Sequence, residues 1–238
     1  MGMKSLDIGI FRHGSSRYQQ RIISLEEAHD LIEEEIPTIS EKAEEFRHFL
    51  HSKVTIYSSL YGRALHTSKV IKEALDDFCY DEIQIFPEPL LNEVSNFDWK
   101  LFSPLVYGGT VNYQSEKIMV DAGKTNPRRL TAQEYFFRDC CHEFSPECVS
   151  ALPKSYRNAL ESMERCSDVS KRMETFLYAL ESPIPVIAVT HEALVYNLLH
   201  RASDGKRHSL SPGHFLHVEK DTSGIYLHEN EKGFLKVL

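Results

Sequence analysis

Short apolar runs alternate with longer segments of helical spacing along most of the chain, and this alternation constrains the fold more than any other feature. The run Ser5–Phe11 is rich in β-branched and large apolar residues, which predicts a buried strand, and further strands are predicted at Val54–Ser58, Ile83–Phe86 and Pro185–Thr190, the last of them continuously apolar. Apolar residues recur in steps of three and four in the expected helices, at Arg63–Leu75, Tyr156–Leu180 and Glu192–His200. Strands that alternate with helices form βαβ units, so we expect an α/β fold of three layers (α/β/α) with a mainly parallel central sheet.

Two further patterns extend this outline. Thr38 and Glu41 have the spacing of a capping box, which predicts an amphipathic helix that begins at Thr38 and continues to about His51. Two closing strands, paired across a turn at Asp221–Gly224, are expected at Phe215–Glu219 and Ile225–His228.

The regular pattern loosens between about residues 101 and 153, where glycines, a proline and scattered aromatic residues interrupt it. The edges of this stretch are not sharp, and no internal repeat or low-complexity tract occurs. We therefore expect a single domain over residues 1–238 with an insertion or lid at about 98–153, rather than a separate second domain.

The charge balance and the cysteines narrow the class of protein. The chain of 238 residues has 27 Lys and Arg against 35 Asp and Glu, a net charge of −8, whereas nucleic-acid-binding proteins normally carry a basic excess. The five cysteines are odd in number and include no Cys-x-x-Cys pair, which argues against a disulfide framework and a zinc ribbon. No apolar run approaches the roughly 18 residues that cross a membrane, and no apolar signal segment opens the sequence. We expect a cytoplasmic protein with neither a membrane nor a nucleic-acid partner.

Residues with chemically useful side chains follow four of the predicted strands. In chain order they are Arg12 and His13, Arg63, Glu93, and His191 with Glu192. Ligands of α/β proteins bind beyond the carboxyl ends of the parallel strands, so we expect these side chains to share one site.

The residue types in this set suit phosphoryl transfer. The guanidinium forks of Arg12 and Arg63 match phosphate oxygens and stay charged at neutral pH. A neutral imidazole is a nucleophile toward phosphorus, and a carboxylic acid can protonate the leaving oxygen and then activate a water. Because surrounding positive charge stabilises the transferring phosphoryl group, the set can work through a phosphohistidine with no metal and no other cofactor.

Four segments, in chain order, resemble the motifs of the histidine phosphatase superfamily, the phosphoglycerate mutase-like proteins. Phe11–Ser16 (FRHGSS) resembles its Arg-His-Gly signature, and Ser58–Thr67 (SSLYGRALHT) looks like its "SSPLxRAxQT" segment. Leu91–Glu93 (LNE), followed by Trp99, resembles its "LxE…W" segment, and Val189–His191 (VTH) is similar to its second histidine. The matches span the chain from residue 12 to residue 191.

The resemblance implies a phosphoglycerate mutase-like fold and a role for each matching residue. His13 would be the phosphorylated nucleophile, and Glu93 would be the proton donor. The phosphoryl oxygens would be bound by Arg12, Arg63 and His191, and further substrate contacts would come from Ser16, Gln19 and Glu192.

Departures from the family pattern leave alternatives open. Tyr18–Gln20 does not match the continuation of the mutase signature, so we expect a phosphatase ahead of a phosphoglycerate mutase-type phosphoryl mutase. Relatives of the acid-phosphatase branch have an Asp after the second histidine that serves as proton donor, so Glu192 rivals Glu93 for that role. A third hypothesis, a non-catalytic phospho-ligand binding protein, stays open because several residues beside the motifs are unusual for the family. These residues include Ser15, His66 and Lys100.

The sequence thus predicts a metal-independent phosphomonoester phosphatase that acts on a small phosphorylated substrate or on a phosphoprotein. The remaining histidines that suggest a metal site lack carboxylate or cysteine partners at suitable spacing; they are His48, His51, His208, His214 and His217. The natural substrate and the oligomeric state have no signature in the sequence.

Overall fold

The structure is a computed structural model. It describes residues 5–15, 31–50, 53–76, 78, 83–94, 154, 158, 162, 164–181, 184–202, 210–229 and 233–236. The chain divides into two compact units, one formed by Met1–Glu93 with Ser170–Leu238 and the other by Val94–Val169. The predicted insertion at 98–153 lies outside the described residues.

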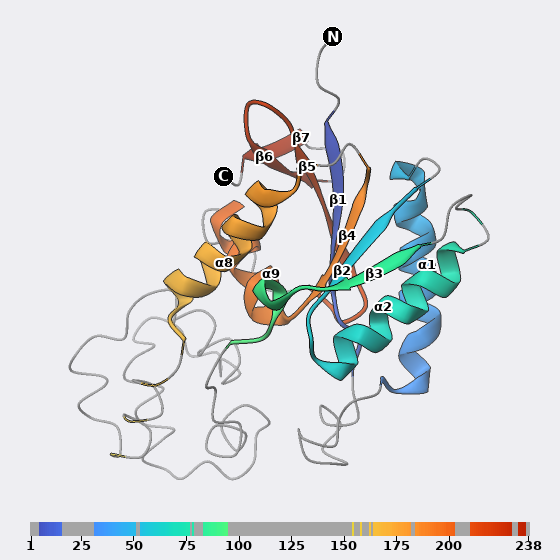
Figure 1. The fold of residues 1–238 in the computed structure, drawn as a ribbon, viewed down its shortest axis with the longest axis horizontal. Helices are drawn as coiled ribbons and strands as arrows, with labels where there is room; N and C mark the ends of the chain where they lie inside the picture. The colour runs from blue at the N-terminus through green and yellow to red at the C-terminus, as the bar shows by residue number, and fades with distance from the viewer. Residues whose placement is uncertain are drawn as a thin grey trace, which may run out of the picture. The chain divides into compact units, whose positions relative to one another are not determined.

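Seven strands of the described chain form one sheet in the order β3-β2-β4-β1-β5-β6-β7 (Figure 1). The strands are β1 (Leu6–Arg12), β2 (Thr55–Ser58), β3 (Gln84–Pro87), β4 (Val186–Thr190), β5 (Phe215–Lys220), β6 (Ile225–Glu229) and β7 (Gly233–Lys236). Strands β3, β2, β4 and β1 are parallel to one another, whereas β5, β6 and β7 continue the sheet in antiparallel fashion.

The register of the parallel strands aligns their carboxyl ends. Arg12 of β1 pairs with Thr190 of β4, and Ser58 of β2 pairs with Val189 of the same strand. The residues that follow β1, β2 and β4 therefore leave the sheet at one edge. This edge is where the sequence places its chemically useful side chains.

Helices cover both faces of the sheet (Figure 1). One face carries α1 (Ile36–Phe46) and α2 (Gly62–Leu75), and the other carries α9 (Glu192–Ala202) and the part of α8 (Cys166–Ala179) that begins at Ser170. Three short 3₁₀ helices connect these elements: η1 (Glu33–Glu35), η2 (Arg47–Phe49) and η3 (Pro89–Leu91). The predicted three-layer α/β/α architecture is confirmed.

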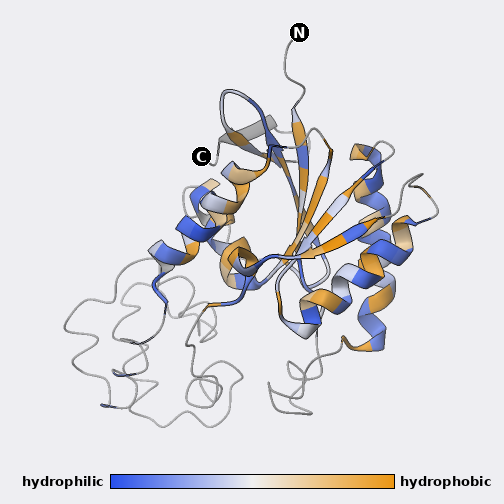
Figure 2. Cartoon of the chain, viewed as in Figure 1, coloured by the Kyte–Doolittle hydropathy of each residue, from blue (hydrophilic) through white to orange (hydrophobic). Residues whose placement is uncertain are grey.

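Apolar side chains on both sides of the sheet form the core. All residues of β4 are buried, and Figure 2 shows that the central strands are largely hydrophobic. The ring of Phe11 stacks on Phe215 at a centroid distance of 5.0 Å, and Phe46 of α1 packs edge-on against both rings. A Cβ at Gly9 would lie only 3.0 Å from the Phe46 ring, so glycine there lets α1 approach the sheet closely.

The predicted capping box at Thr38 is wrong. The helix begins two residues earlier, at Ile36, and Thr38 lies inside its first turn. Pro37 sits in that turn, where its fixed φ favours a helix and its missing N–H costs no hydrogen bond. The start is therefore set by η1 and Pro37 rather than by a threonine side chain.

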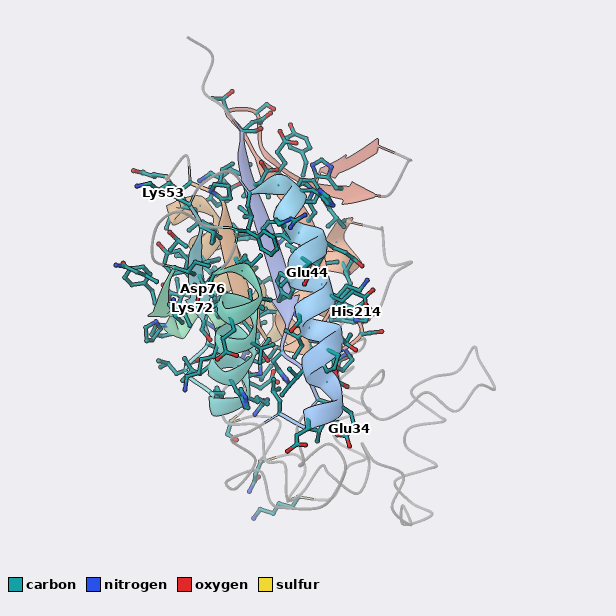
Figure 3. All side chains as sticks on the ribbon, turned by 90° about the vertical axis from the view of Figure 1, so that its right-hand side faces the viewer. Glu34, Glu44, Lys53, Lys72, Asp76 and His214 are labelled. Carbon is teal, nitrogen blue, oxygen red and sulfur yellow. The ribbon has the colours of Figure 1, made fainter. Side chains whose placement is uncertain are left out.

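The outer sides of α1 and α2 carry charged side chains, which Figure 3 views face-on. Glu44 of α1 is exposed, and Lys72 Nζ lies 3.3 Å from Asp76 Oδ1 one turn further along α2. In the ranges that the structure describes, no helix has both the length and the apolar character that crossing a membrane requires.

Candidate active site

His13 is the first residue after β1, and its ring is fixed from the backbone. Its amide N–H donates to Thr190 O at 2.9 Å, and its Nδ1 lies 2.7 Å from Gly14 O. A carbonyl oxygen can only accept, so Nδ1 carries the proton and Nε2 keeps its lone pair. Arg63 Nε donates to that Nε2 at 3.0 Å. The nitrogen that faces the site is therefore the nucleophilic one.

Arg63 links the two histidines. It occupies the first turn of α2, and its buried guanidinium also places Nη2 3.0 Å from His191 Nδ1. The same Nη2 lies 3.6 Å from Glu93 Oε2. Thr67, one turn along α2, accepts from the Gly14 amide and donates to Arg63 O, so the helix and the loop after β1 are held together.

A chain of hydrogen bonds orients His191. Its Nδ1 accepts from Arg63, so the ring proton lies on Nε2, which donates to Ser59 Oγ at 2.7 Å. Ser59 Oγ in turn donates to Asn92 Oδ1 at 3.0 Å, and Leu60 N–H donates to the same oxygen at 2.8 Å. His13 and His191 lie edge to face, with ring centroids 4.9 Å apart.

Burial and neighbouring cations keep both histidines neutral. Desolvation lowers the pKa of His13 well below its ordinary value of 6.5, and the Arg63 guanidinium lowers it further. The pKa of His191 is lowered well below 6.5 by the same two causes, with smaller contributions from His13, Arg172 and Arg12. Both rings are thus uncharged at neutral pH, which leaves the His13 lone pair available for attack.

Glu93 reaches the site from a loop that is held at several points. Thr190 Oγ1 donates to Leu91 O at 2.7 Å, and Arg172 Nη1 donates to the carbonyls of Leu90 and Asn92. These contacts bring Glu93 Oε2 to 3.4 Å from His191 Nδ1. The carboxylate is buried beside one guanidinium and one imidazole.

Arg12, directly before His13, is held by an ion pair and by main-chain contacts. Its Nη2 lies 2.8 Å from Glu192 Oε2, and its Nη1 donates to Leu210 O at 2.6 Å. The Arg12 amide donates to His214 O, and the Arg12 carbonyl accepts from the Gly213 amide. Both side chains of the ion pair are largely buried.

The structure brings six of the eight predicted site residues together. They are Arg12, His13, Arg63, Glu93, His191 and Glu192. Ser16 and Gln19 lie outside the described residues. Sequence reasoning gave no role to Asn92 or Arg172; the polar Asn beside Glu93 was visible in the LNE segment, whereas Arg172 had no local signal.

The described residues include no group of three or more His, Cys, Asp or Glu side chains placed to hold a metal ion. Two of the histidines considered for a metal have other contacts, His217 with Asp7 Oδ1 at 2.8 Å and His214 with Pro212 O at 3.1 Å. His51 and His208 lie outside the described ranges.

Comparison with solved structures identifies the architecture. No protein-family model matches the sequence, and no curated protein sequence matches it. A phosphoglycerate mutase from Bacillus anthracis superposes with a TM-score of 0.66 at 13% identity, over 96% of this chain and 93% of that one. The chain has a phosphoglycerate mutase-like fold.

Two further histidine phosphatase-like structures have the same fold. The alpha-ribazole phosphatase from Shigella flexneri has a TM-score of 0.54 at 14% identity, over 98% of this chain and 96% of its own. A mycobacterial glucosyl-3-phosphoglycerate phosphatase in complex with VO3 has a TM-score of 0.54 at 15% identity, over 90% of both chains. The predicted phosphoglycerate mutase-like fold is confirmed.

Proposed function

We propose that the protein is a phosphoric monoester hydrolase that works through a phosphohistidine on His13 without a metal. The observation that carries this proposal is the state of the His13 ring, which is buried, neutral and has its Nε2 lone pair directed to Arg63 at 3.0 Å. A neutral, fixed imidazole next to a guanidinium is what attack on a phosphoryl group requires.

The first half of the cycle transfers the phosphoryl group to the enzyme. His13 Nε2 attacks phosphorus, so an N–P bond forms while the bond to the ester oxygen breaks. The leaving alkoxide takes a proton from the carboxylic acid form of Glu93. The proton on His13 Nδ1 stays hydrogen-bonded to Gly14 O, which stabilises the ring as it gains positive character.

The second half releases the phosphate. Glu93, now ionised, accepts a proton from a water that attacks phosphorus, and the N–P bond breaks to regenerate neutral His13. Arg12, Arg63 and His191 would bind the equatorial oxygens in both halves. Arg63 Nε must leave His13 Nε2 for a phosphoryl oxygen when substrate arrives, since one lone pair cannot serve both.

The contacts of the two carboxylates favour Glu93 over Glu192 as the proton donor. Glu192 makes a direct ion pair with Arg12 at 2.8 Å, which favours its ionised form. Glu93 lies further from its cationic neighbour Arg63, at 3.6 Å, and within reach of His191 at 3.4 Å. A carboxyl group that must be protonated before attack is better placed at the longer distance from a guanidinium, because a closer cation favours the ionised form.

Two of the structural neighbours are named as phosphatases, which supports phosphomonoesters as the substrate class. We expect a small phosphorylated substrate or a phosphoprotein. The cytoplasm remains our expected location.

Hydrolysis of p-nitrophenyl phosphate from about pH 5 to 8, with EDTA present, tests the chemistry. Wild-type turnover should resist EDTA and fall by roughly a thousandfold or more in His13→Ala. Exposed His48 offers a matched control, and His48→Ala should keep full activity. Acid-quenched wild type should also carry an acid-labile phosphoryl group on His13.

Substantial turnover in His13→Ala would refute the mechanism. Tight phosphate binding without turnover of any ester would instead support a non-catalytic phospho-ligand binding protein. Interconversion of phosphoglycerates faster than their hydrolysis would support a phosphoryl mutase.

A further inference from the structure

We propose that Glu192 competes with the phosphate of the substrate for Arg12, so that anions bind more tightly as the site becomes more acidic. This inference rests on the proposed function, because it assumes that Arg12 binds phosphoryl oxygens. It assigns Glu192 a role in setting substrate affinity, in place of proton donation.

The hydrogen bonds of Arg12 show where the competition occurs. A guanidinium presents Nε and Nη2 along one edge, and this edge can bind two oxygens of a phosphate or a carboxylate at once. Glu192 Oε2 occupies the Nη2 half of the edge at 2.8 Å. The Nε half is buried and has no hydrogen-bond partner among the described residues. Glu192 therefore holds half of the two-oxygen edge and leaves the other half unsatisfied.

A phosphate that binds both halves must displace Glu192 from Nη2. The gain is an acceptor for Arg12 Nε, a buried N–H group that otherwise loses its hydrogen bond to water. The loss is the ion pair with Glu192. Since the two effects oppose each other, the charge of Glu192 decides how tightly the anion binds.

Glu192 is not needed to place Arg12. The Nη1 atom donates to Leu210 O at 2.6 Å, and the Arg12 main chain is bonded to both His214 and Gly213. The side chain is thus anchored at its tip and its backbone without the carboxylate. A purely positioning role would duplicate contacts that already exist.

The charges of the site point the same way. Each of its two guanidiniums faces a carboxylate, Arg12 with Glu192 and Arg63 with Glu93. His13 and His191 are neutral, and the proposed mechanism needs Glu93 protonated before attack, so these six side chains then carry two positive charges and the negative charge of Glu192. A dianionic phosphomonoester must therefore bind beside the Glu192 carboxylate, and neutralising Glu192 relieves this repulsion.

Glu192 also begins α9, with its side chain in the first turn. The partial positive charge of a helix N-terminus stabilises an ionised carboxylate there. The competitor is therefore charged at neutral pH and loses its charge only as the medium becomes acidic.

Sulfate is a suitable probe, because it keeps two negative charges between pH 5 and 8 whereas phosphate titrates in this range. Calorimetry should give at least about tenfold tighter sulfate binding at pH 7.5 for Glu192→Gln than for the wild type. The difference should persist from pH 8 to 5, because the ion pair and the helix N-terminus favour the ionised carboxylate, and it should shrink only at lower pH, where sulfate still keeps its two charges. Glu44→Gln removes an exposed carboxylate from α1 and should match the wild type at every pH.

Unchanged or weaker sulfate binding by Glu192→Gln would overturn the inference and leave the proposed function intact if the wild type still hydrolyses esters. A fall in kcat at unchanged sulfate affinity would assign Glu192 to proton donation and overturn the inference too. If neither the wild type nor any variant bound sulfate, both this inference and the proposed phosphate site would be refuted. Should Glu192→Gln fail to fold by circular dichroism, Glu192→Ser removes the same charge and should tighten binding in the same way.

Discussion

Replacing Ser59 with alanine removes the hydroxyl that connects His191 to Asn92. In the wild type this hydroxyl accepts from His191 Nε2 at 2.7 Å and donates to Asn92 Oδ1 at 3.0 Å, and both Ser59 and His191 are fully buried. The alanine Cβ keeps the backbone and most of the packing, so the substitution isolates the loss of these hydrogen bonds.

The size of the effect follows from what is left unpaired. The Asn92 oxygen keeps the Leu60 amide as a donor, whereas His191 Nε2–H and the Tyr61 amide lose the acceptor seen here. A buried donor without an acceptor costs about 1–3 kcal/mol, and we expect that loss in the free energy of unfolding. The ring also loses one of the two contacts that orient it, and a misplaced group of this kind lowers kcat/KM by roughly tenfold to a hundredfold.

Urea titration and steady-state hydrolysis of p-nitrophenyl phosphate measure the two effects. Nitrogen-15 NMR should find the His191 proton on Nε2 in the wild type and also in Ser59→Ala, because Arg63 still donates to Nδ1. Ser68→Ala is the matched control, because the Ser68 hydroxyl is also fully buried but, among the residues that the structure describes, bonds only to Ala64 O at 2.9 Å within α2. The control should lose stability and keep its kcat/KM. Turnover by Ser59→Ala within twofold of the wild type would refute the reasoning.

Three further predictions concern the surroundings of the site. Gly14→Ala should lower the free energy of unfolding by about 1–3 kcal/mol in urea titration, because the new Cβ would lie 2.7 Å from Ile39 Cδ1; an unchanged midpoint would contradict the close contact. Arg172→Met removes the donor to two carbonyls of the loop that carries the proposed acid, so kcat should fall more than KM rises; unaltered steady-state kinetics would show that the loop holds without it. The pKa values of His13 and His191 are lowered in the folded state, so the unfolded chain binds more protons below pH 6.5. The melting temperature should therefore be highest above pH 6.5 and fall between pH 6.5 and 5, and a flat profile in that range would be inconsistent with two buried neutral histidines.

The elements with the strongest local signals were predictable to within a residue or two. The run PVIAVT predicts a fully buried strand, and β4 occupies Val186–Thr190 because parallel strands covered on both faces are apolar throughout. The turn at Asp221–Gly224 was equally predictable from the sequence. The Asp221 carboxylate accepts from the amides of Ser223 and Gly224, and Gly224 adopts a φ of 156°.

The residues of the candidate site were predictable from the sequence, whereas the contacts between their side chains were not. Position after a strand is a local property, so the sequence could bring His13 and His191 to one edge of the sheet. The donor to Leu90 and Asn92 comes from Arg172 on a distant helix, and no spacing rule links these residues. The Arg12–Glu192 ion pair likewise depends on how two strand ends align in space.

Strand β1 has consequences for how the chain is made. Of the described strands it comes first along the chain, yet its two neighbours in the sheet are β4 and β5, which follow β2 and β3 in sequence. The carbonyls that hold Arg12, at Leu210 and His214, also come from this later part of the chain. During translation β1 therefore remains an apolar segment without its two sheet partners until β4 and β5 have been made. A chain that stops short of β5 would expose this apolar segment to chaperones and proteases.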